Sequence, residues 1–124
     1  MRRTVLVVDD DAATRRLYAA FLDKELEVLS VDTGVGAVEM IEQRPADLVI
    51  MDLNMPGLDG WMAISLIRAR RPDVPFLIVT SQTEPDLEAR ARTFGASGFL
   101  RKPVTADSLR QAVDRAMKPA RPTP

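Results

Sequence analysis

The stretch VIMDLNMPGLDG, residues 49–60, runs from an apolar segment into a carboxylate and then into a loop rich in turn residues. The apolar segment covers 47–51, and Asp52 follows it directly. Two further segments of this kind occupy 4–8 and 75–80. Short runs made almost entirely of Val, Ile and Leu are typical of strands buried on both faces of a parallel sheet. The stretch therefore predicts a central strand that ends at Asp52.

The rest of the chain alternates in the same way. Residues 26–31 and 97–101 are more mixed in polarity, which favours strands nearer the edges of the sheet. Helical patterns lie at 12–24, 34–44, 60–71, 84–94 and 106–117. Five strands alternating with five helices predict an α/β three-layer sandwich, because a chain of this length is too short for an eight-unit barrel.

Several residues are placed where helices begin or end. Asp59 and Thr105 are expected to cap the N-termini of the third and fifth helices. Thr83 and Asp86 have the spacing of a capping box at the start of the fourth helix, and Gly95 is expected to end it. These signals support the helix boundaries drawn from the apolar pattern.

Composition limits the function classes. A chain of 124 residues suits one domain, and its net charge of -1 provides no strong basic field for nucleic acid or an anionic membrane. It contains no cysteine and no histidine, which excludes disulfides, thiolate or imidazole metal sites and a phosphohistidine of its own. The first apolar run is too short for a signal peptide or a membrane span, so we expect a cytoplasmic protein.

Polar side chains follow four of the five predicted strands. Asp9 and Asp10 follow the first, Asp52 the third and Lys102 the fifth, while Thr80 ends the fourth. Right-handed crossovers bring these strand ends to one edge of the sheet, where open α/β sheets bind ligands. Two carboxylates about 4 Å apart repel by roughly 4 kcal/mol at an effective dielectric of about 20, so three convergent acids favour a bound cation. Oxygen ligands alone indicate a hard ion, Mg²⁺ or Mn²⁺.

A simpler interpretation of the acids remains open. Asp11 has an ordinary use as the N-cap of the next helix, and its neighbours could be solvated turn residues. Lys102 and Thr80 favour the site, because an ammonium group and a hydroxyl can both contact a phosphoryl oxygen. Acids, a divalent cation, a lysine and a hydroxyl together are the components of a phosphoryl-transfer site.

Five short motifs occur in order at these strand ends. They are VVDD (7–10), MDLNMPGLDG (51–60), VTS (79–81), GASGF (95–99) and KP (102–103). With them the chain resembles, over residues 4–117, the response-regulator receiver domain of two-component signalling. The resemblance includes stand-alone receivers of the chemotaxis type. It implies a flavodoxin-like fold with strand order 2-1-3-4-5, a receiver domain over 1–118 and a disordered Pro-rich tail over 119–124.

The resemblance also implies roles for the acidic residues. Asp52 corresponds to the phosphoacceptor. Asp10 and Asp52 correspond to carboxylate ligands of Mg²⁺, and Asp9 to an acid that acts on the ion directly or through water. The third protein ligand in the family is the backbone carbonyl at the position of Asn54. Lys102 corresponds to the lysine that pairs with the phosphoryl group.

A second set of residues corresponds to the switch. Thr80 matches the hydroxyl residue that bonds to the phosphoryl group, and Phe99 matches the aromatic residue that turns inward when this happens. Asn54 and Gln82 flank the route of the hydrolytic water and are expected to tune its rate. The family typically has a cis peptide before the proline at position 103.

The resemblance implies partners as well. A histidine kinase or a histidine phosphotransfer protein would donate the phosphoryl group, and the surface of the fourth helix, fifth strand and fifth helix would contact a downstream protein or output domain. The fourth helical segment has few large apolar residues, mainly Leu87 and Phe94, which favours a weakly anchored helix. The chain would be no enzyme beyond its own phosphorylation and dephosphorylation, and no nucleic acid or membrane contact is expected.

Three other functions each share some of these features. A Mg²⁺-dependent phosphohydrolase of the haloacid dehalogenase type needs a second aspartate where this chain has Asn54, which cannot exchange a proton. A flavodoxin-like carrier of flavin needs backbone donors for a phosphate, whereas residues 9–15 read DDDAATR and are acidic. A receiver that folds without being phosphorylated would be an interaction module, but the expected site residues are all present.

Overall fold

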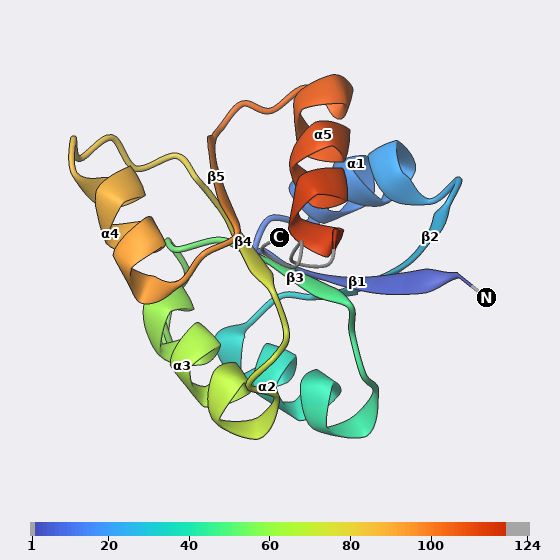
Figure 1. The fold of residues 1–124 in the computed structure, drawn as a ribbon, viewed down its shortest axis with the longest axis horizontal. Helices are drawn as coiled ribbons and strands as arrows, with labels where there is room; N and C mark the ends of the chain where they lie inside the picture. The colour runs from blue at the N-terminus through green and yellow to red at the C-terminus, as the bar shows by residue number, and fades with distance from the viewer. Residues whose placement is uncertain (1, 119–124) are drawn as a thin grey trace, which may run out of the picture.

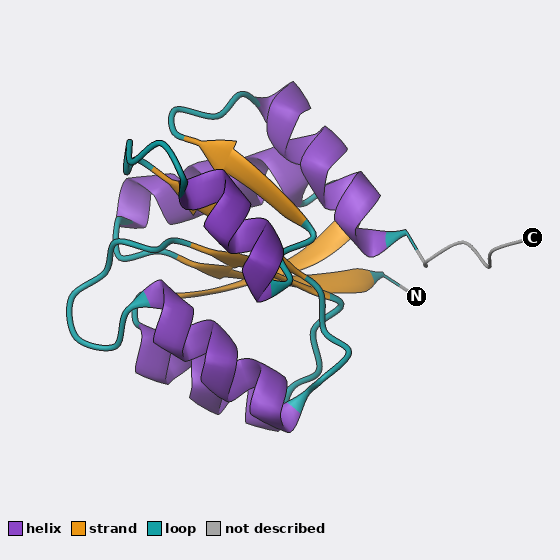
Figure 2. Cartoon of the chain, turned by 60° about the vertical axis from the view of Figure 1, so that its left-hand side comes forward, coloured by secondary structure: helices purple, strands orange, loops and turns teal. Residues whose placement is uncertain are grey.

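A computed structural model describes residues 2–118 as a parallel sheet covered by helices on both faces (Figure 1). The predicted three-layer sandwich is confirmed, and Figure 2 shows the helices on either side of the strands. The predicted tail, 119–124, lies outside the described residues. The elements in chain order are β1 (Arg3–Val8), α1 (Ala12–Leu22), β2 (Leu26–Val31), α2 (Gly34–Gln43), β3 (Leu48–Met51), α3 (Gly60–Arg70), β4 (Phe76–Thr80), α4 (Leu87–Phe94), β5 (Gly98–Arg101) and α5 (Ala106–Met117).

The strand order is β2-β1-β3-β4-β5 and every neighbouring pair is parallel. This confirms the order 2-1-3-4-5 and places the two mixed strands, β2 and β5, at the edges. Val8 of β1 is in register with Met51 of β3. The backbone N–H of Asp52 then donates to the carbonyl of Val8 at 3.0 Å. The residues that follow these two strands are consequently neighbours.

The core has two parts, one on each face of the sheet. Successive side chains of a strand point to opposite faces, so each central strand contributes to both parts. One part joins the sheet to α2, α3 and α4, and it includes Leu6, Val49, Phe76 and Ile78. The other joins the sheet to α1 and α5, and it includes Val7, Ile50, Leu77, Val79 and Leu109. Burial on both faces explains why β1, β3 and β4 read as continuous apolar runs.

The predicted helix caps are confirmed, except at the start of α4. Asp59 accepts a hydrogen bond from the Met62 N–H at 2.9 Å, and Thr105 forms a capping box with Ser108. Gly95 ends α4 in the left-handed conformation, with φ 103°.

The prediction for the start of α4 was wrong. The helix begins at Leu87, and Asp86 occupies the N-cap position without a side-chain cap bond. Pro85 accounts for the difference, because a proline disfavours helical dihedral angles in the residue before it. Glu84 and Thr83 therefore stay in the loop, and α4 has only eight residues.

Few side chains hold this short helix to the body of the domain. Leu87 and Ala91 are its buried residues. Phe94 packs edge-on against Trp61 of α3, with ring centroids 5.2 Å apart, and against Phe76 at 6.2 Å. Limited burial agrees with the predicted weak anchoring of α4. Within residues 2–118 no helix has the length and apolar character needed to cross a bilayer.

Gly60 begins α3 against the backbone of the strand end. A Cβ atom added at this position would lie 2.5 Å from the carbonyl oxygen of Asp52 and 2.8 Å from the Cα of Leu53. Real side chains do not come so close to backbone atoms, so only glycine allows the helix to start here.

Gly60→Ala is therefore expected to destabilise the protein by about 1–3 kcal/mol, the usual cost of forcing an extra methyl group into a filled space. Urea unfolding measures the change. Ser65→Ala, on the exposed side of the same helix, is the control and should change stability by less than about 0.5 kcal/mol. Equal stability of Gly60→Ala and the unchanged protein would contradict the close approach.

Candidate functional site

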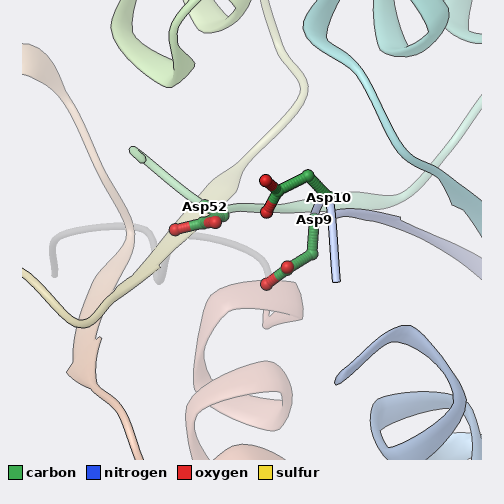
Figure 3. A group of neighbouring side chains, drawn as sticks. All are labelled: Asp9, Asp10 and Asp52. Carbon is green, nitrogen blue, oxygen red and sulfur yellow. The ribbon is translucent and has the colours of Figure 1, made fainter. Parts of the chain in front are cut away.

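Three carboxylates converge at the C-terminal edge of the sheet (Figure 3). Asp9 and Asp10 leave the end of β1 and Asp52 leaves the end of β3. One oxygen from each lies within 4.8 Å of the others. Asp9 and Asp52 are almost fully buried, with 2% and 4% of their surface exposed, whereas Asp10 is exposed. The structure thus brings together the acids predicted from the strand ends.

Lys102 lies beside the two buried acids. Its Nζ is 2.7 Å from Oδ2 of Asp9 and 3.7 Å from Oδ2 of Asp52. The peptide between Lys102 and Pro103 is cis, as the resemblance implied. The lysine is only partly exposed, so its charge acts on the carboxylates with little screening by solvent. The ammonium group therefore compensates two negative charges that the fold holds out of water.

The balance of burial and charge is visible in the pKa values. Burial raises the pKa of Asp52 to about 6, Lys102 acts against this rise, and the negative charge of Asp9 adds to it. Burial alone would lower the pKa of Lys102, but its hydrogen bond to Asp9 and the charge of Asp52 outweigh burial and raise it. At neutral pH Asp52 is thus mostly ionised, but burial makes the ionised form less stable than it would be in water. Such a carboxylate is suited to binding a cation or an electrophile.

Asp11 has the ordinary use predicted for it. Its carboxylate accepts hydrogen bonds from the N–H and the hydroxyl of Thr14 at 3.0 and 2.5 Å, which caps α1. The bonds to Thr14 also lower the pKa of Asp11. This residue is therefore separate from the convergent acids.

Thr80 ends β4 with its side chain fully buried. Its hydroxyl oxygen accepts a hydrogen bond from the N–H of Gln82 at 3.1 Å, and its carbonyl accepts one from the N–H of Lys102 at 2.8 Å. The hydroxyl proton is not used in either bond. Thr80 can therefore donate to a further acceptor while it remains tied to the loop that follows it.

The loop after β3 closes over Asp52. The N–H of Asn54 donates to Oδ1 of Asp52 at 3.2 Å, and the side chain of Asn54 is exposed. Phe99 of β5 is half-buried and packs against the part of the core that includes α4. Asn54 thus lies against Asp52 itself, whereas Phe99 connects the edge strand β5 to the part of the core that includes α4.

Two arginines contact the backbone near the site, and their positions in the sequence did not predict these contacts. Arg15 of α1 donates to the carbonyl of Asp9 at 2.7 Å and so holds the end of β1. Arg101 of β5 contacts the loop between β4 and α4. All three bonds are to backbone carbonyls, so no pairing of side-chain types in the sequence could reveal them.

The donor set has a definite chemical preference. Carboxylate oxygens without nitrogen or sulfur ligands suit a hard divalent ion. An exposed Asp10 beside a buried Asp52 leaves such an ion open to water on one side. A site of this kind can hold an oxyanion next to Asp52, because the ion and Lys102 both offset its negative charge.

Comparison with known proteins identifies the family. Residues 5–114 match the model of the response regulator receiver domain. The chain belongs to this family, the receiver domains of two-component response regulators, which are signalling switches. As a class, response regulators receive phosphoryl groups from histidine kinases and act on output domains.

Individual relatives agree with this assignment. Regulatory protein LuxO of Vibrio cholerae is 34% identical over 115 residues, which cover 92% of this chain and 25% of LuxO. Transcriptional regulatory protein PdtaR of Mycobacterium tuberculosis is 38% identical over 117 residues, which cover 93% of this chain and 57% of PdtaR. The chain thus spans only part of the length of both relatives.

Solved structures show the same likeness. Chemotaxis protein CheY4 of Vibrio cholerae matches with a TM-score of 0.87 and 28% identity, covering 94% of this chain and 99% of CheY4. The receiver domain of a LuxO repressor protein from Vibrio parahaemolyticus matches with a TM-score of 0.88 and 30% identity, covering 94% and 91%. The flavodoxin-like fold predicted from the resemblance is therefore confirmed.

The raised pKa of Asp52 predicts that Asp52→Asn stabilises the protein in metal-free buffer at neutral pH. A carboxyl group whose pKa rises from 3.8 to about 6 on folding favours the folded state at low pH. As the pH rises from about 4 through 6, this contribution is lost and the free energy of unfolding falls by at most about 3 kcal/mol. The amide has no such loss, so its advantage should be small near pH 4 and largest above pH 7.

Urea unfolding with a chelator present, at about pH 4 and pH 7.5, measures this difference. Asp73→Asn is the control, because it removes one exposed carboxylate outside the site. An advantage of Asp52→Asn that is equal at both pH values would contradict the burial of an ionised Asp52.

Proposed function

We propose that this chain is a phospho-accepting switch of a two-component phosphorelay, in which Asp52 accepts a phosphoryl group from a phosphohistidine. The observation that carries the proposal is the position of Asp52: a buried carboxylate within reach of two other acids and 3.7 Å from the ammonium group of Lys102. Membership of the receiver family supports the same chemistry. We take residues 1–118 as the receiver unit and the cytoplasm as its place of action.

Asp9, Asp10 and Asp52 would hold Mg²⁺, or Mn²⁺ in its place. The fit rests on three oxygens within 4.8 Å of one another and on the absence of softer ligands among them. The backbone carbonyl of Asn54 is the further protein ligand that we propose. The ion would offset negative charge on the phosphoryl oxygens.

In the transfer step, an oxygen of Asp52 forms a bond to phosphorus while the bond between phosphorus and the donor's imidazole nitrogen breaks. The released imidazole keeps the electron pair of that bond and takes a proton from solvent. Lys102 offsets the charge of the transferred group, for which it must share its ammonium group between Asp9 and the phosphoryl oxygens. The phosphoryl donor would be a histidine kinase or a histidine phosphotransfer protein.

The phosphorylated state would be transmitted through Thr80 and Phe99. Thr80 has a hydroxyl proton available to a phosphoryl oxygen, and its movement would allow Phe99 to turn inward. The face formed by α4, β5 and α5 would then change towards a downstream protein or output domain. Weak anchoring of the short α4 supports this choice of face.

Hydrolysis would return the switch to its first state. Water attacks the phosphorus atom and the bond from phosphorus to the Asp52 oxygen breaks. The carboxylate of Asp52 is restored, and inorganic phosphate leaves. The exposed Asn54 and the half-buried Gln82 flank the strand ends from which this water would approach. We propose that these two side chains tune the rate.

Incubation with a small phosphodonor and Mg²⁺ should add one phosphoryl group to the protein. Intact-mass spectrometry detects it, and peptide mapping should place it on Asp52. Asp52→Asn should gain none, because an amide oxygen is a poor nucleophile, while Asp59→Asn should gain the group as the unchanged protein does. Equal labelling of Asp52→Asn, or no labelling of the unchanged protein, would overturn the proposal.

Mg²⁺ should raise the melting temperature of the protein, because an ion that binds only the folded state stabilises it. Asp10→Asn should weaken Mg²⁺ binding by about tenfold or more, since even changes outside the ligand shell commonly cost that much. Titration calorimetry measures the affinity. Asp11→Asn keeps a capping oxygen outside the site and is the matched control, so equal weakening by both variants would contradict the proposed ligand set.

A further inference from the structure

Arg101 joins two parts of the domain that the proposed switch must move. Its guanidinium donates hydrogen bonds to the carbonyl of Gln82 and, at 3.1 Å, to the carbonyl of Glu84. Both carbonyls belong to the loop between β4 and α4. The same guanidinium lies over the ring of Phe99, with its central carbon 5.2 Å from the ring centroid. One side chain thus contacts the loop and the aromatic residue at once.

The strand geometry explains this arrangement. Phe99 and Arg101 are two residues apart on β5, so their side chains leave the same face of the sheet. Phe99 packs against the part of the core that includes α4, whereas Leu100 between them packs against the part that includes α5. Arg101 is therefore directed towards the α4 side, where the planar guanidinium can lie on a ring and bond to carbonyls at its edge.

The loop that Arg101 holds is also tied to Thr80. The N–H of Gln82 donates to the hydroxyl oxygen of Thr80 at 3.1 Å, and the carbonyl of Gln82 accepts from Arg101. A continuous set of contacts therefore runs from Thr80 through Gln82 to Arg101 and on to Phe99. A movement of Thr80 towards Asp52 would pull Gln82 with it, and this displacement would require the contact between Gln82 and Arg101 to be released.

We propose that Arg101 is a positioning residue that holds the β4–α4 loop and Phe99 in the arrangement seen here and thereby opposes the phosphorylated conformation. This inference rests on the proposed function, because it presumes that Thr80 moves when Asp52 is modified. The charged hydrogen bonds and the cation–π contact of Arg101 stabilise only the arrangement of the loop and Phe99 that is seen here. Their loss shifts the equilibrium towards the other arrangement.

The test compares four proteins, each spanning residues 1–124: the unchanged chain, Arg101→Ala, Arg101→Lys and Arg115→Ala. The probe is beryllium trifluoride, a stable mimic of the phosphoryl group, at saturating Mg²⁺. Arg115 lies exposed on α5 and outside these contacts, so its variant controls for the loss of one exposed arginine. Titration calorimetry gives the dissociation constant of the probe, and thermal unfolding gives stability.

Arg101→Ala should bind the probe about fivefold more tightly, at the lower end of the usual range of coupling between sites. Arg101→Lys keeps the charge but not the planar fork, so its affinity should lie between those of the unchanged protein and Arg101→Ala. Arg115→Ala should stay within about twofold of the unchanged protein. A residue with a merely structural role would lower the melting temperature without tightening the binding of the probe.

Hydrogen exchange provides a second measurement that does not depend on the probe. Without Mg²⁺, the amides of Gln82, Thr83, Glu84 and Asp86 should exchange faster in Arg101→Ala than in Arg115→Ala, while amides of β1 and β3 keep their rates. Unchanged exchange in this loop, or probe binding no tighter than in Arg115→Ala, would overturn the inference. Failure of the unchanged protein to bind the probe would instead overturn the proposed function, and the inference with it.

Discussion

The pairing of Lys102 with two buried carboxylates is the interaction on which the site depends. Asp9 and Asp52 are held close together out of water by the register of β1 and β3, and their repulsion would be costly without a cation. Lys102 supplies one positive charge for two negative ones. The remaining imbalance makes the edge of the sheet receptive to a further cation, and this receptivity comes from burial as much as from the number of acids.

The fold imposes this pairing through its backbone. Parallel strands end at one edge, so residues from distant parts of the sequence meet there without any loop having to reach across the molecule. Gly60 extends the constraint to α3, whose first residue rests on the carbonyl of Asp52. The end of β3 thus lies between β1 and β4 and against the start of α3, and Asp52 has little freedom to move away from its neighbours.

Much of this arrangement could be predicted from the sequence because it follows from apolar pattern and strand ends. The runs that contain Val7, Ile50 and Val79 indicated a doubly buried sheet, and the polar residues after them indicated the site. The strand order came from family resemblance, since periodicity does not specify which strands are neighbours, and the roles proposed for Thr80 and Phe99 rest on the same resemblance. The prediction for the start of α4 was wrong because the backbone restriction that Pro85 places on Glu84 outweighs the side-chain capping pattern at Thr83.

Other features could not be predicted because they are tertiary. The closer contact of Lys102 with Asp9 than with Asp52 depends on the position of the β5 end relative to β1. The contacts of Arg15 and Arg101 are with backbone carbonyls, which every residue carries, so residue identity alone does not indicate them. Such contacts become visible only when the loops are placed in space.

The hydrogen bond from the N–H of Lys102 to the carbonyl of Thr80 has a consequence for how the domain responds. Lys102, which compensates the charge of the carboxylates, and Thr80, which would contact a phosphoryl group on Asp52, are joined through their main chains at the ends of β5 and β4. Displacing one without the other would strain or break this bond, so partial responses are disfavoured. This single sheet hydrogen bond thus couples the main-chain positions of the two residues.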